Sequence, residues 1–157
     1  MIQAYNLNGY DVDTLKIQDI KDAGIFISIF ECILNTKNST MKTADPNQTI
    51  SLEVACIQVG MNGYADFIFD IDNQIQNLID LDNKVFAMIR EIKDFSLDNI
   101  QWHAINKTAD FLKIMIFVNK IRSKNEGKCK LSTSKTHLIY IIKYCVEDKT
   151  QLFYMVD

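Results

Sequence analysis

Apolar and polar residues alternate along two pairs of neighbouring segments, and each pair encloses a turn signal. Thr49–Val59 and Tyr64–Ile71 flank Asn62-Gly63, a dipeptide that favours the tight turn of a β-hairpin. A second alternating pair lies between residues 137 and 156, interrupted by the polar run at 147–150. The pattern therefore predicts two hairpins, over 49–71 and 137–156.

One segment has the spacing of an amphipathic helix. In Asp82–Phe95 the apolar positions recur every three or four residues, and Asp82 suits the cap at its start. Asp11–Ala23 also predicts a short helix, because Gly24 follows it as a stop signal, although Thr14–Ile20 alternates enough to be read as a strand. Ile2–Leu7 is predicted to be a short first strand.

Two further apolar segments are richer in β-branched residues. Ile25–Leu34 predicts a buried strand. Phe111–Ile121 fits a helix or a strand, and its β-branched content favours the strand. The polar segments 35–48, which holds the only proline, and 122–134 predict flexible loops.

The composition is that of one globular domain. The chain has 157 residues, of which 48% are hydrophobic and 24% charged. We therefore expect a single domain over 1–157 with a strand-rich α+β fold, an antiparallel sheet with β-hairpins and one or two packed helices. No export signal and no long apolar run is present, which predicts a soluble, cytoplasmic protein with four free cysteines and no membrane contact.

Charge is distributed unevenly along the chain. Residues 1–82 carry twelve acidic residues and four lysines, whereas residues 83–157 carry eight acidic and thirteen basic residues. Complementary halves of this kind neutralise each other within one fold, or favour a partner or a second copy of the chain.

The strand period aligns three carboxylates with one another. Asp66, Asp70 and Asp72 fall on one face of the predicted strand, while Phe67, Phe69 and Ile71 fall on the other. Such a face is explained by solvation, by Mg²⁺, by the chain's own basic segment or by a basic protein partner. We predict a partner surface made of Asp66, Asp70, Asp72, Asp80 and Asp82. The basic segment opposite in charge consists of Lys120, Arg122, Lys124, Lys128, Lys130 and Lys135.

No established catalytic or phosphate-binding motif is present, so we predict no catalytic residue, no cofactor and no metal. Trp102-His103 could form a substrate platform with a general base, but the favoured interpretation is a core tryptophan beside a locally hydrogen-bonded histidine. His137 opens an apolar strand, and the same structural interpretation is favoured there. Cys129 is flanked by two lysines, which would lower its pKa only slightly if they point away from it. One arginine and no aromatic residue in the basic segment make nucleic-acid binding unlikely.

Three classes of function fit these features. The first is a non-enzymatic protein-binding or inhibitory module of immunity, antitoxin or anti-defence type, which uses its acidic surface to meet a basic partner. The second is a structural or assembly subunit of an oligomer or phage-like particle. The third is a small enzyme whose site is assembled only in three dimensions. The sequence favours the first.

Overall fold

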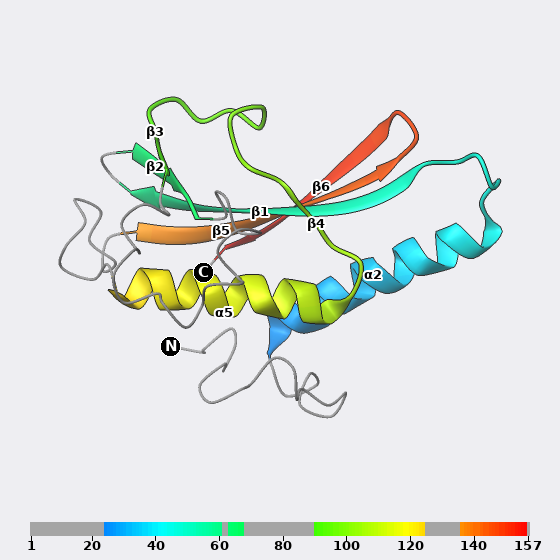
Figure 1. Cartoon of the computed structure of the whole chain (residues 1–157), viewed down its shortest axis with the longest axis horizontal. Coiled ribbons are helices and arrows are strands. Elements are labelled where there is room, and N and C mark those ends of the chain that lie inside the picture. The colour runs from blue at the N-terminus through cyan, green and yellow to red at the C-terminus, as the bar shows by residue number, and fades with distance from the viewer. Residues whose placement is uncertain (1–23, 61–62, 68–89, 125–135, 157) are drawn as a thin grey trace. The chain divides into compact units, whose positions relative to one another are not determined.

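The computed structural model of the chain describes residues 24–60, 63–67, 90–124 and 136–156 (Figure 1). The described part contains two helices and an antiparallel sheet with hairpins, which confirms the predicted strand-rich α+β class. The elements in chain order are α2 (Ile25–Thr43), β1 (Ile50–Gly60), β2 (Gly63–Asp66), β3 (Arg90–Ile92), β4 (His103–Ala104), α5 (Thr108–Lys124), β5 (Thr136–Val146) and β6 (Lys149–Val156).

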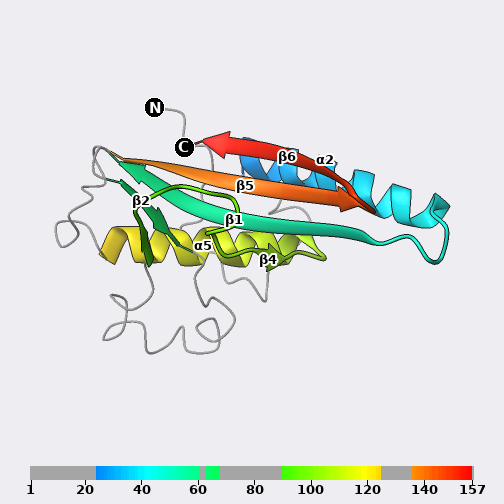
Figure 2. The ribbon, with the colours of Figure 1, turned by 90° about the horizontal axis from the view of Figure 1, so that it is seen from above.

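The strands of the described sheet follow the order β3-β2-β1-β5-β6, and β4 pairs with β1. Both predicted hairpins are confirmed within the described residues (Figure 1 and Figure 2). In the first, Gly60 pairs with Gly63 and Val59 with Tyr64. In the second, Glu147 and Asp148 form the turn, with Glu147 at a φ of 53°, in the left-handed region that tight hairpin turns require.

The segment predicted to be a strand at 25–34 and a loop from 35 is instead the helix α2. Its buried residues include Phe26, Phe30 and Ile33, spaced by three and four, which is a helical and not a strand period. Threonine hydroxyls in its second half donate to carbonyls four residues earlier, so polar residues are accommodated within the helix. The Ala44 N–H bonds to Thr40 O, and Pro46 follows, which ends the helix.

The strand predicted at 111–121 is also a helix, α5. Its apolar residues alternate as in a strand because the helix is buried around most of its circumference. The fully buried residues are Phe111, Leu112, Ile114, Met115, Phe117 and Val118. The predicted helix at 82–95 is wrong at its end, where Arg90–Ile92 forms β3 and pairs antiparallel with β2. Residues 81–89, and the elements predicted before residue 24, lie outside the described residues.

The chain divides into two compact units, each made of three chain segments. The first comprises residues 1–53, 104–116 and 142–153, and the second comprises residues 54–103, 117–141 and 154–157. The long elements β1, α5, β5 and β6 each continue from one unit into the other. The two units are described separately below.

The core of the first unit joins its two helices. Phe30 of α2 and Phe111 of α5 are both fully buried and stack with ring centroids 4.2 Å apart and an angle of 14° between the planes. Lys37 is also buried, and its Nζ donates to Ile105 O at 3.2 Å and to Asn106 Oδ1 at 3.4 Å. Ile105 in turn donates its N–H to Leu52 O on β1. Aromatic packing and a buried ammonium thus position the start of α5.

Candidate functional site

The acidic surface predicted from the strand period is not formed at Asp66. This residue is fully buried, and its Oδ2 accepts the backbone N–H of Gln101 at 2.7 Å. Phe67, the next residue, is buried as well and donates its N–H to Cys56 O. Consecutive residues of a strand point to opposite faces, so both faces are buried at this position. The prediction that Asp66 faces water is therefore wrong. Asp70, Asp72, Asp80 and Asp82 lie outside the described residues.

In the second unit, Asp66 belongs to a buried polar cluster that we define as Cys56, Asp66, Arg122 and Tyr140. The cluster draws one residue from each of β1, β2, α5 and β5. Burial raises the pKa of the Cys56 thiol well above its ordinary value, and the Asp66 carboxylate raises it further. The nearby Tyr140 hydroxyl and the positive charge of Arg122 lower the pKa of Cys56, but these are smaller effects.

Two hydrogen bonds to Thr136, one from Gln58 and one from Arg122, continue the cluster along the strands. Gln58 is buried, and its Nε2 donates to Thr136 Oγ1 at 2.7 Å. Arg122, half-buried at the end of α5, donates from Nη2 to the backbone oxygen of Thr136 at 3.3 Å. Buried polar groups are stable only when such partners are present, and networks of this kind fix one arrangement of the surrounding elements.

The chemistry of the cluster is that of a neutral thiol beside a carboxylate and a guanidinium. Because only the thiolate is a strong nucleophile or metal ligand, a raised pKa makes Cys56 inert at neutral pH. The residues that the structure describes contain no group of three or more potential metal-binding side chains. The cluster therefore positions elements and does not by itself supply nucleophilic or metal chemistry.

We predict that Cys56 resists alkylation in the folded protein, whereas the exposed Cys32 reacts readily.

Folding also raises the pKa of Cys56, which makes stability depend on pH. The contribution of the buried neutral thiol to stability is complete below the unfolded-state pKa and is lost as pH rises toward the folded-state pKa. The free energy of unfolding should thus fall as pH rises above the ordinary pKa of a cysteine thiol, about 8.5. The matched variant Cys56→Ala should show a flatter profile in urea titrations at several pH values. Equal profiles would contradict the prediction.

An open cavity of about 500 Å³ adjoins the segment that Asp66 holds in place. Ile92 and Ile100 are the buried residues of its lining, and Lys93, Asp94 and Asp98 supply charges of both signs. Gln101 also lines the cavity, and its backbone N–H is the group bound by Asp66. The buried cluster therefore fixes the position of one part of the cavity wall.

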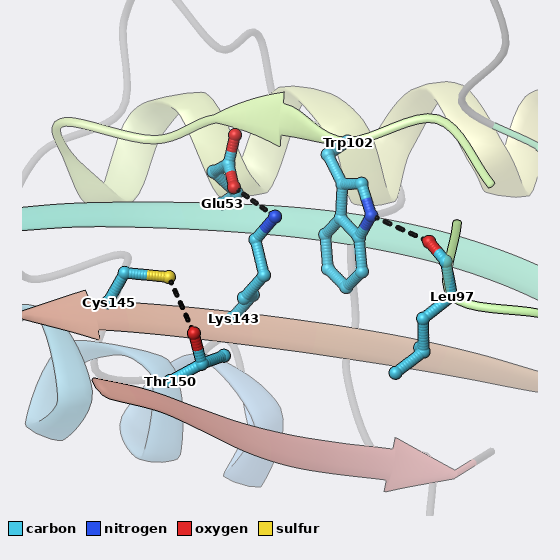
Figure 3. A network of polar contacts seen from close by, with 6 residues as sticks. All are labelled: Glu53, Leu97, Trp102, Lys143, Cys145 and Thr150. Carbon is cyan, nitrogen blue, oxygen red and sulfur yellow. Dashed lines mark hydrogen bonds and ion pairs between the residues drawn. The ribbon is translucent and has the colours of Figure 1, made fainter. Parts of the chain in front are cut away.

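The other residues singled out from the sequence fall in different places. Trp102 is half-buried, and its Nε1 donates to Leu97 O at 3.1 Å (Figure 3), as expected of an anchoring tryptophan. His103 begins β4 and is half-buried, while His137 is exposed on β5. Of the predicted basic segment, Lys120, Arg122 and Lys124 belong to helix α5 and not to a loop. Cys129, Lys128, Lys130 and Lys135 lie outside the described residues.

The N-termini of the two described helices differ from a phosphate cradle. At α5, Asp110 Oδ2 accepts the backbone N–H groups of Asn106 and Lys107, both at 3.2 Å. The carboxylate thus occupies the positive end of the helix dipole, where an anion would otherwise bind. Helix α2 begins with Ile25-Phe26-Ile27 and has no acidic, basic or hydroxyl side chain before Ser28.

No protein-family model matches the sequence, and no curated protein matches it. The fold, however, is similar to that of kinesin motor domains. A structure of a fast kinesin has a TM-score of 0.57 and 12% identity, over 98% of this chain and 42% of that one. Drosophila NOD docked with bovine tubulin into a map of nucleotide-free NOD on the microtubule has a TM-score of 0.60 and 11% identity, over 98% and 45%. Drosophila NOD with manganese and ADP has a TM-score of 0.60 and 10% identity, over 92% and 39%.

These similarities correct the functional prediction. The matching structures are motor domains, so the prediction of an inhibitory module of immunity or antitoxin type is wrong. The chain spans less than half the length of each of these structures. In the part of the chain that the structure describes, no helix is both long enough and apolar enough to cross a membrane.

Proposed function

We propose that this chain contributes a kinesin-type motor fold that associates with microtubules. The observation that supports the proposal is the fold similarity, which extends over nearly the whole chain and includes a structure of NOD complexed to the microtubule. The partner we propose is thus a protein filament.

The proposal contains no nucleotide step. One of the similar structures is described for its ATPase mechanism and another is a complex with ADP, so the requirements of a phosphate group are relevant to this fold. A phosphate loop supplies free backbone N–H groups at a helix N-terminus together with a lysine and a serine or threonine. The sequence lacks that motif, Asp110 fills the N-terminus of α5, and α2 begins with apolar residues. The residues at these two helix N-termini do not fit the phosphates of a nucleoside triphosphate.

Co-sedimentation with stabilised microtubules tests the proposed function. We expect the full chain to pellet with microtubules with a Kd below about 10 μM, an affinity sufficient for detectable binding at micromolar polymer concentration. Actin filaments serve as the control for non-specific electrostatic association. Protein that stays in the supernatant with microtubules, or that pellets equally with actin, would contradict the proposal.

A further inference from the structure

The segment that joins β3 to β4 in the second unit is held at several points. The Phe95 ring contacts the Tyr64 ring of β2, with the ring centroids 5.5 Å apart. The Trp102 Nε1–H donates to Leu97 O at 3.1 Å (Figure 3), and the Gln101 N–H is bound by the buried cluster. These contacts fix the shape of the segment, and a preformed site loses little conformational entropy when a ligand binds.

This segment and the end of β3 line the open cavity of about 500 Å³, a volume within the range of small-molecule sites. Its lining combines the buried Ile92 and Ile100 with exposed polar residues, which are Lys93, Asp94, Asp98, Asn99 and Gln101. Within the part of the chain that the structure describes, the charged groups of Lys93, Asp94 and Asp98 form no ion pair and no side-chain hydrogen bond. Apolar surface with a few convergent polar groups is the usual form of a small-molecule site.

We propose that this cavity binds a free basic amino acid, such as lysine or arginine. The lining carries one positive and two negative charges, and a basic amino acid carries the opposite set, one carboxylate and two cationic groups joined by an alkyl chain. Lys93 binds the carboxylate, while Asp94 and Asp98 bind the α-ammonium and the side-chain cation. The alkyl chain packs on the apolar part of the lining, which Ile92 and Ile100 supply.

The charge pattern selects this ligand class over simpler ones. An amino acid with an apolar side chain leaves one of the two aspartates without a cation, and a diamine without a carboxylate is repelled by Lys93. A phosphate or another anion is repelled by both aspartates. The inference depends on the charges of the cavity and not on microtubule association, so either one can fail without the other.

Titration calorimetry of the full chain with L-lysine tests the ligand class. We expect saturable binding with a Kd of about 1 mM, as suits a small ligand in an open cavity. Norleucine has the same carbon chain without the side-chain cation, and cadaverine has both amines without the carboxylate. Each should bind at least about tenfold more weakly than lysine. Nα-Acetyl-L-lysine lacks the α-ammonium and should also bind about tenfold more weakly. Equal binding of the acetylated compound would indicate a basic residue at a peptide C-terminus and would overturn the assignment to a free amino acid.

Variants of the lining test the site itself. Lys93→Gln and Asp98→Asn should each raise the Kd for L-lysine about tenfold, with an unchanged circular dichroism spectrum because both residues are exposed. Asp148→Asn is the matched control, since it removes the same charge from the exposed turn between β5 and β6, and its Kd should stay within about twofold of the wild type. Lack of saturable lysine binding up to about 50 mM, or an Asp98→Asn variant that binds as tightly as Asp148→Asn, would overturn the proposal.

Discussion

Phe111→Ala is expected to lower the free energy of unfolding by about 3–5 kcal/mol, the range found when a buried phenylalanine leaves a cavity. Phe111 is fully buried and stacks on Phe30, so the substitution removes the contact that joins α2 to α5 in the first unit. Urea unfolding followed by circular dichroism measures the change.

Ile29→Ala provides the control for that experiment. Ile29 also lies on α2 but is 40% exposed, and substitutions at such positions usually change stability by less than about 0.5 kcal/mol when no specific contact is lost. If Phe111→Ala cost no more than Ile29→Ala, the two helices would not share the core described for the first unit.

Asp66→Ala is expected to cost about 2–4 kcal/mol in the second unit, because it removes a buried acceptor and a buried negative charge together. The Gln101 N–H would lose its carboxylate partner, and Cys56 would keep the positive charge of Arg122 near it without the negative charge of Asp66. Asp66→Asn retains an acceptor oxygen and should cost less. Urea unfolding of both variants, compared with the exposed-site control Asp98→Asn, measures the difference.

A double-mutant cycle on Asp66 and Arg122 gives a sharper form of the same prediction. If the loss reflects an uncompensated charge, the double variant D66A/R122M should be more stable than the sum of the single losses implies. Additive losses would show that Asp66 acts only as the acceptor for Gln101, and a neutral Asp66→Ala would contradict the description of the buried cluster altogether.

Sequence patterns predicted the hairpins better than the helices. A strand period of two is unambiguous where one strand face is polar and a turn dipeptide follows, as between Val59 and Tyr64. The hydrophobic pattern does not identify helix α5, because the helix is apolar around most of its circumference and has no polar face from which its period could be read. Helix α2 was hidden by its threonines, which bond to carbonyls of the preceding turn.

The buried cluster could not be predicted from the sequence, since its members lie on four elements far apart along the chain. Cys56 alone had a correct signal, an apolar surrounding that predicted a buried, reduced thiol. Asp66 was misplaced because alternation assigns a residue to a face without showing what covers that face. One of only two arginines in the chain, Arg122, was a signal of a specific role that composition could have supplied.

The sequence contains no established phosphate-binding motif. The sequence alone predicted no cofactor, and that remains a prediction. At the start of α5, Asp110 accepts the N–H groups of Asn106 and Lys107, so a carboxylate already stands at the end of the helix that would attract a phosphate. The function we propose is therefore filament binding by a motor-type fold, without a nucleotide step.

The microtubule affinity of the full chain in three nucleotide conditions tests this central claim most directly. Kd should be measured by co-sedimentation with no nucleotide, with ADP and with a non-hydrolysable ATP analogue. We expect the same microtubule Kd within about twofold in all three conditions, because a nucleotide that does not bind the chain cannot shift its binding to microtubules. A change of about tenfold or more between any two conditions would show nucleotide coupling and would contradict the account.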